Sequence, residues 1–114
     1  MALTIPARPG YLVLARLALS AVCRLTPLEA VEIADLKLAV TEAANEFVEE
    51  NEEDERTVSF LFRLEEDRLV LELSGPADVT ESSEQELGRA IIDATVDEST
   101  FTAGRTVLVK RLTA

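Results

Sequence analysis

Hydrophobic residues in the central part of the chain recur at a helical spacing. Apolar side chains return about every 3.6 positions, at Ile33, Leu36, Val40, Ala43 and Phe47. The Thr-Pro-Leu-Glu segment at residues 26–29 is typical of a capping box with proline at the first helical position. We therefore expect a helix that begins at Pro27 and that would span roughly 35 Å if it continued unbroken to about Glu49.

A second helix is predicted over residues 11–24, where the sequence is apolar almost all round. Its polar residues form one narrow stripe with a spacing of four positions, made of Arg16, Ser20 and Arg24. A helix with so narrow a polar face is either deeply buried or covered by a partner. The pattern leaves both alternatives open.

Two segments in the middle of the chain follow a strand pattern. Residues 56–64 and 69–74 place apolar side chains at every second position, and a charged turn joins them, which predicts a β-hairpin. Residues 2–5 form a candidate edge strand, which Pro6 ends because proline cannot donate to a ladder.

The C-terminal third of the chain predicts one more helix and one more hairpin. Ser82 or Ser83 can cap a helix over residues 84–96. Residues 100–102 and 106–110 predict a hairpin that turns at Gly104. The order of elements predicts a two-layer α/β sandwich, with the helices on one face of a mixed, mainly antiparallel sheet.

Length and charge narrow the possible functions. A chain of 114 residues is long enough for a single core, so we expect one domain over residues 1–114. The net charge is −11, with 22 acidic residues against 11 basic ones. This balance disfavours a nucleic-acid binder, which needs lysine and arginine to neutralise phosphates. An acidic regulator suits a basic protein partner, because opposite charges steer the two molecules together.

Three absences remove further classes of function. The chain has no histidine, which excludes histidine-based triads and histidine metal sites. Its one cysteine, Cys23, cannot form an internal disulfide, and its apolar neighbours predict a buried, inert thiol. No segment is typical of a signal peptide or a membrane span, so we expect a cytoplasmic protein with no membrane partner.

A carboxylate and a carboxamide on the central helix are the first candidates for chemistry. Glu42 and Asn45 lie three positions apart and are expected together at the margin of the apolar face. The alternative is a solvated polar edge of an amphipathic helix. The acidic run over residues 49–55 is interpreted as a solvated loop, since it lacks the glycine of a calcium-binding loop.

The sequence Asp-Leu-Lys-Leu-Ala-Val-Thr-Glu-Ala-Ala at residues 35–44 resembles a helix of the anti-sigma-factor serine kinases. These proteins are a branch of the GHKL superfamily of histidine-kinase-like ATPases, which have the Bergerat fold, and the resemblance covers nearly the whole chain. It implies that Glu42 matches the family's catalytic base. The family's magnesium-binding asparagine follows four residues later, where this chain has Glu46, while Asn45 comes one residue early. Glu46 could offer an oxygen to a hard cation.

Two further family motifs are only partly kept. The Asp-x-Gly-x-Gly motif falls on residues 73–77, where Gly75 remains and Leu73 replaces the aspartate that binds adenine. The glycine-rich lid maps onto residues 85–89, where Gly88 remains. The closing strand again resembles the family, and Thr106 matches its nucleotide-side threonine. The resemblance thus implies ATP and magnesium as ligands, while the changed residues argue against both.

The resemblance also implies protein partners. Arg16 matches an arginine on the family's first helix that contacts both the sigma factor and the anti-anti-sigma (STAS-domain) protein. Its alternative role is to cover core surface with its aliphatic stem. We interpret the chain as an anti-sigma regulator that acts by binding these partners as a homodimer, with nucleotide binding weakened or lost. The alternatives are an active ATP-dependent serine kinase that phosphorylates the STAS protein, and a dimerising scaffold unrelated to transcription.

Overall fold

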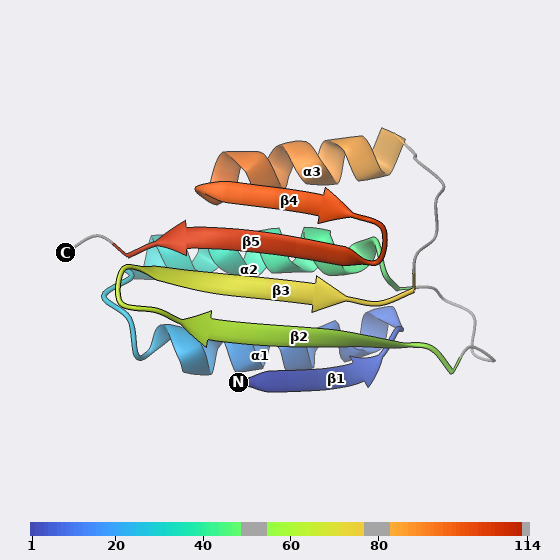
Figure 1. Ribbon diagram of the computed structural model, residues 1–114, viewed down its shortest axis with the longest axis horizontal. Coiled ribbons are helices and arrows are strands. Elements are labelled where there is room, and N and C mark those ends of the chain that lie inside the picture. Colours follow the sequence, from blue (N-terminus) through green and yellow to red (C-terminus); the bar gives the residue numbers. More distant parts are fainter. Residues whose placement is uncertain (49–54, 77–82, 113–114) are drawn as a thin grey trace.

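The computed structural model describes residues 1–48, 55–76 and 83–112. Within these residues the chain forms five strands and three α-helices, in the order strand, helix, helix, strand, strand, helix, strand, strand. Figure 1 shows how they are arranged. The elements are β1 (Ala2–Pro6), the 3-10 turn η1 (Pro9–Tyr11), α1 (Leu12–Cys23), α2 (Ala30–Asn45), β2 (Thr57–Leu64), β3 (Arg68–Ser74), α3 (Ser83–Thr95), β4 (Glu98–Thr102) and β5 (Arg105–Arg111).

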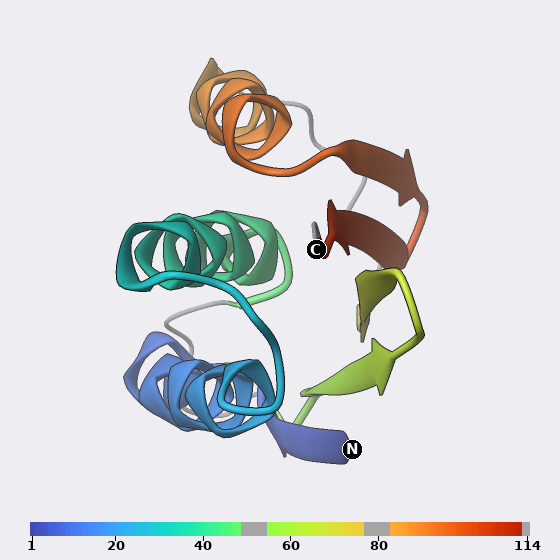
Figure 2. The same ribbon diagram turned by 90° about the vertical axis from the view of Figure 1, so that its left-hand side faces the viewer.

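The five strands form one sheet in the order β1-β2-β3-β5-β4. All four pairings between neighbouring strands are antiparallel, so the described sheet is antiparallel throughout rather than mixed. Figure 2 shows the three helices side by side on one face of the curved sheet, while the other face carries no helix. The predicted two-layer α/β sandwich is confirmed.

The predicted alternation of strand residues sets the core. On β2 and β3 every second side chain points at the helices and is almost fully buried, namely Val58, Phe60, Phe62, Leu69, Leu71 and Leu73. From the helix layer, Leu36 and Val40 of α2 meet them with at most 1% of their surface exposed. Each such residue contributes about 1.5 to 3 kcal/mol by leaving water. One continuous cluster therefore joins the two layers.

The central helix α2 is shorter than the sequence predicts. It runs over Ala30–Asn45, so it does not begin at Pro27 or continue to Glu49. Glu29 has an extended backbone, and its N–H donates to Oε1 of Glu32 at 3.3 Å, which places the helix start three residues later than expected. At 1.5 Å per residue the helix spans about 24 Å.

Thr26 acts at the end of α1 instead of at the start of α2. Its hydroxyl donates to the carbonyl of Cys23 at 2.7 Å and accepts the N–H of Leu28 at 3.3 Å. The hydroxyl therefore satisfies a terminal carbonyl of the first helix and holds the turn that leads to the second.

The predicted polar stripe of α1 is not its main exposed face. Arg16 is half-buried, and its guanidinium nitrogen Nη1 lies 3.4 Å from Oγ1 of Thr41 on α2. On the same helix, Leu17 is 61% exposed and Val13 is 45% exposed. The polar stripe partly faces the neighbouring helix, so α1 presents leucine and valine side chains to solvent.

Candidate functional site

The C-terminal half of α2 and the first turns of α3 lie against each other. Glu42 comes from α2, Glu46 is the C-cap residue of that helix, and Gln85, Gly88 and Arg89 come from α3. Residues 85–89, which the resemblance maps onto a glycine-rich lid, are helical in this chain and belong to Ser83–Thr95. The predicted lid position is therefore a packed helix.

The carboxylate of Glu46 is held by three nitrogen donors from α3. Its Oε1 accepts from Nε2 of Gln85 at 2.7 Å and from Nη2 of Arg89 at 3.0 Å. Its Oε2 accepts from Nε of Arg89 at 3.3 Å. The fork of the guanidinium thus meets both carboxylate oxygens, which is the strong, bidentate form of the arginine–carboxylate pair.

Arg89 also packs on the sheet. The central carbon of its guanidinium lies 4.5 Å from the centre of the Phe101 ring on β4. A cation over an aromatic face is attracted by the ring quadrupole. Arg89 therefore joins α3 both to α2 and to the outermost strand β4.

Glu42 meets α3 at its only described glycine. A Cβ atom built on Gly88 would lie 3.0 Å from Oε2 of Glu42. The missing side chain leaves room for the Glu42 carboxylate at this point. Glu42 is half-buried there, one helical turn before Glu46.

Asn45 does not share this contact. It is exposed, whereas Glu42 and Glu46 are half-buried at α3. Positions four apart on a helix share a face, and one further residue turns the side chain by about 100°. The structure thus places Glu46 together with Glu42 toward α3, and the grouping of Glu42 with Asn45 stays a prediction.

The two remaining predicted site residues, Gly75 and Thr106, and the changed motif position Leu73 lie in the segment after β3, on β5 and on β3. Leu73 is fully buried and stands opposite Thr106, which is 2% exposed, in the β3–β5 pair. The N–H of Gly75 donates to the carbonyl of Gly104 at 3.0 Å, and a Cβ atom on Gly75 would lie 3.1 Å from Cδ1 of Phe47. This region is apolar and closely packed. Ala77, which stands at the second glycine of the Asp-x-Gly-x-Gly motif, lies outside the described residues.

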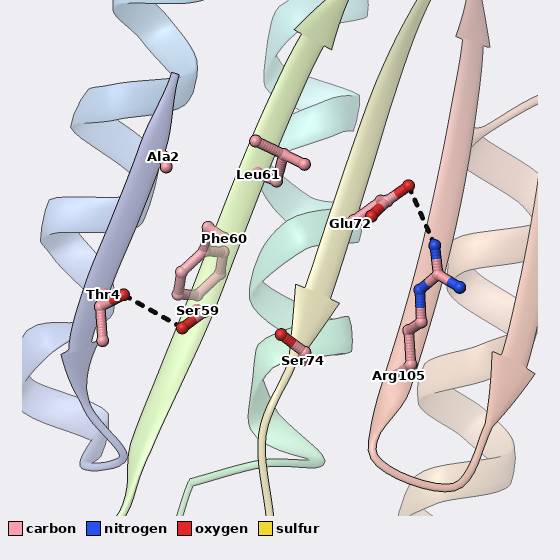
Figure 3. A pocket seen from close by; sticks show the side chains of 8 residues that line it. All are labelled: Ala2, Thr4, Ser59, Phe60, Leu61, Glu72, Ser74 and Arg105. Carbon is pink, nitrogen blue, oxygen red and sulfur yellow. Dashed lines mark hydrogen bonds and ion pairs between the residues drawn. The ribbon is translucent and has the colours of Figure 1, made fainter.

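A separate hollow of about 310 Å³ lies on the helix-free face of the sheet (Figure 3). The carboxylate of Glu72 stands at its side and binds Arg63 at 2.8 Å and Arg105 at 3.1 Å. The hydroxyls of Thr4 and Ser59 hydrogen-bond each other at 3.0 Å on the opposite side. The hollow is separated by the sheet from Glu42 and Glu46.

The sequence profile of the histidine kinase-like ATPase domain matches residues 5–111. The chain belongs to this family. No curated protein matches the sequence. A similar solved structure is the crystal structure of the RsbU and RsbW domains of Rv1364c from Mycobacterium tuberculosis, with 16% sequence identity and a TM-score of 0.64. The match covers 98% of this chain and 32% of that chain, and it supports the fold.

Membership of the ATPase-domain family raises the question of whether these residues fit a magnesium nucleotide. At the position that the resemblance assigns to adenine binding, the buried Leu73 offers no acceptor for an amino group, and an unsatisfied buried donor costs about 1 to 3 kcal/mol. At the position that the resemblance assigns to the metal ligand, the carboxylate of Glu46 already accepts three hydrogen bonds. Within the described ranges, no group of three or more acidic, cysteine or histidine side chains is placed to hold a metal ion. These residues do not fit the group.

The sequence analysis did not identify the donors that bind Glu46. Gln85 and Arg89 stand four positions apart on an amphipathic helix, so their spacing predicts that they share one face of it. The spacing does not predict which acidic residue they would contact, because Glu46 lies 39 and 43 positions earlier in the chain.

In the part of the chain that the structure describes, no helix is long and apolar enough to cross a membrane.

Proposed function

We propose that this ATPase-family domain is an anti-sigma regulator that acts by stoichiometric protein binding, with nucleotide binding weak or lost. Its partners are a sigma factor and a STAS-domain antagonist that compete for overlapping surfaces on a homodimer. The observation that carries this proposal is the exposed apolar face of α1. The RsbW-like fold and the resemblance of residues 35–44 to anti-sigma kinases support the choice of partners.

The exposed face of α1 consists of large aliphatic side chains on neighbouring turns. Leu17 is 61% exposed, Val13 45% and Leu14 42%. Their spacing of three and four positions places them on one side of the helix. Clustered apolar surface of this kind marks interaction sites in proteins that otherwise keep such residues inside. Arg16, next to Leu17, adds a cation at the border of the face.

The charge of the chain supports a basic partner. With a net charge of −11, the domain attracts positively charged proteins at long range and repels acidic ones. This attraction raises the association rate, while the apolar side chains of α1 supply the contact area once the molecules meet.

The runner-up is an active serine kinase. In its favour, the resemblance matches Glu42 to the family's base, and its half-buried side chain lies beside Gly88. A kinase would need the nucleotide and a metal held in line with the attacking serine. Leu73 and the hydrogen-bonded Glu46 argue against that arrangement. A dimerising scaffold with no link to transcription is the third alternative.

The proposal is tested by recovering the partner and then rebuilding the complex from purified proteins. The tagged chain is used to capture proteins from the native cell, and any sigma factor found is expressed and titrated against the wild type. Leu17→Arg places a charge on the α1 face and should weaken binding at least tenfold. Leu87→Arg is the matched control, because Leu87 is 64% exposed on α3 and the variant has the same charge.

Two outcomes would contradict the proposal. If no sigma factor binds the purified wild type at a one-to-one or two-to-one ratio, the anti-sigma function is wrong. If Leu17→Arg and Leu87→Arg bind equally well, the α1 face is not the contact. Calorimetry with Mg-ATP separates the kinase alternative, which requires clear saturable binding by the wild type.

A further inference from the structure

Glu42 on α2 and Glu46 at the C-cap of that helix place two carboxylates four positions apart on one side of the helix end. Like charges at positions i and i+4 repel each other, and a cation beside them removes that cost. In an ATPase domain of this family, a magnesium ion would supply the positive charge. Here the guanidinium of Arg89 lies 3.0 Å from Oε1 of Glu46.

The surroundings of Glu46 leave little room for a second cation. Its side chain is 12% exposed, and three N–H donors already reach its oxygens. An ionised carboxylate has about four acceptor positions, so most are filled by protein. A metal ion at Glu46 would therefore compete with Arg89 and Gln85 for the same oxygens.

Arg89 is itself held from two sides. Its guanidinium is bound edge-on by the carboxylate of Glu46 and stacks at 4.5 Å over the ring of Phe101. The side chain therefore links α2, α3 and β4, and Gln85 adds a second link from α3 to the same carboxylate. Gly88 leaves room for the Glu42 carboxylate between these links.

From this arrangement we infer that Arg89 is a built-in counter-cation, which takes the place of the metal at Glu46 and keeps α3 closed on α2 without any ligand. This inference deepens the proposed function and rests on its claim that nucleotide binding is weak or lost. Arginine stays charged across the physiological pH range, so the closed state needs no ion and no nucleotide.

The test is hydrogen exchange of the α3 amides, measured in the intact chain without ligand. Arg89→Met keeps most of the stem and removes the charge, and Glu46→Gln keeps the shape and removes the opposite charge. Each variant should raise the opening equilibrium of α3 about ten- to hundredfold, as expected for loss of a hydrogen bond between charged groups. The double variant should open no more than the stronger single variant, because both changes break one interaction. Arg68→Met, which removes an exposed pair with Asp67, is the control and should leave α3 unchanged.

Three results would overturn the inference. The first is unchanged α3 exchange in both Arg89→Met and Glu46→Gln. The second is an effect of the double variant equal to the sum of the two single effects. The third is a saturable change of wild-type α3 exchange on adding Mn²⁺ or Mg-ATP, which would mean that a cation displaces Arg89. Glu46→Gln preserves packing, so it decides the case if Arg89→Met unfolds.

Failure of this inference is distinguishable from failure of the proposed function. The exchange experiment contains no sigma factor, so loss of partner binding leaves its outcome unaffected. A wild type that binds a sigma factor through α1 but shows no link between Glu46 and Arg89 would keep the function and remove the counter-cation.

Discussion

The same substitution should have opposite effects at the two glycines that lie beside predicted site residues. In Gly75→Ala the new Cβ would lie 3.1 Å from Cδ1 and 3.4 Å from Cβ and Cγ of Phe47. Phe47 is 7% exposed and packed in the core, so its ring cannot move away freely. Overpacking of this kind costs about 1 to 3 kcal/mol.

In Gly88→Ala the new Cβ would meet only the tip of a flexible side chain, at 3.0 Å from Oε2 of Glu42. That carboxylate can rotate toward solvent. Gly88 also lies inside α3, where alanine is favoured over glycine by about 0.8 to 1 kcal/mol. We therefore expect Gly88→Ala to range from neutral to about 1 kcal/mol more stable than the wild type.

Thermal unfolding followed by circular dichroism measures both effects. For 114 residues the unfolding entropy is about 240 cal/mol/K, so 1 kcal/mol shifts Tm by about 4 °C. Gly75→Ala should lower Tm by about 4 to 12 °C, and Gly88→Ala should leave it unchanged or raise it by up to about 4 °C. The reasoning is refuted if Gly75→Ala is as stable as the wild type, or if Gly88→Ala loses as much stability as Gly75→Ala.

Three further changes test other parts of the structure. Leu73→Asp returns the family's aspartate to a fully buried position. The free energy of unfolding should fall by at least the roughly 2 to 5 kcal/mol of a buried leucine truncation, and calorimetry should detect no gain of Mg-ATP binding. A folded variant that binds ATP would contradict this prediction. Burial raises the pKa of the Cys23 thiol. The contribution of this thiol to stability is therefore present below the unfolded thiol pKa of about 8.5 and is lost as pH rises through the folded value. Urea unfolding between about pH 7.5 and 9.5 should show this decline in the wild type and a smaller one in Cys23→Ala. Arg16→Ala removes a long contact of 3.4 Å with Thr41, so Tm should change by no more than about 4 °C. Sigma-factor binding should fall at least tenfold. Binding equal to that of the wild type would show that Arg16 does not contact the partner.

Most of the fold could be predicted because the alternation of apolar and polar residues along the strands sets their register. The alternation of Val58, Phe60 and Phe62 sets one side of β2 toward the helices, and a shift by one residue would expose all three. Helix ends were less certain. Two overlapping capping patterns begin at Thr26 and at Glu29, and the structure uses the second for α2.

The site could be predicted only where one helix determined it. The spacing on α2 correctly places Glu42 on the margin of the apolar face, but it does not reveal which neighbour covers that margin. The pairing of Glu46 with Arg89 depends on how α2 and α3 pack, and they are joined through two strands. For the same reason the spacing of the polar stripe on α1 did not reveal that Arg16 lies toward α2.

The uncovered leucines of α1 have a consequence for how this protein behaves in solution. A surface that adheres to a partner can also adhere to unrelated molecules, and the charge of −11 opposes such encounters by mutual repulsion. That repulsion reaches only about 8 Å in physiological salt and about 3 Å at 1 M. The purified protein should therefore aggregate and scatter light at high salt concentration, and a partner bound to α1 should keep it in solution.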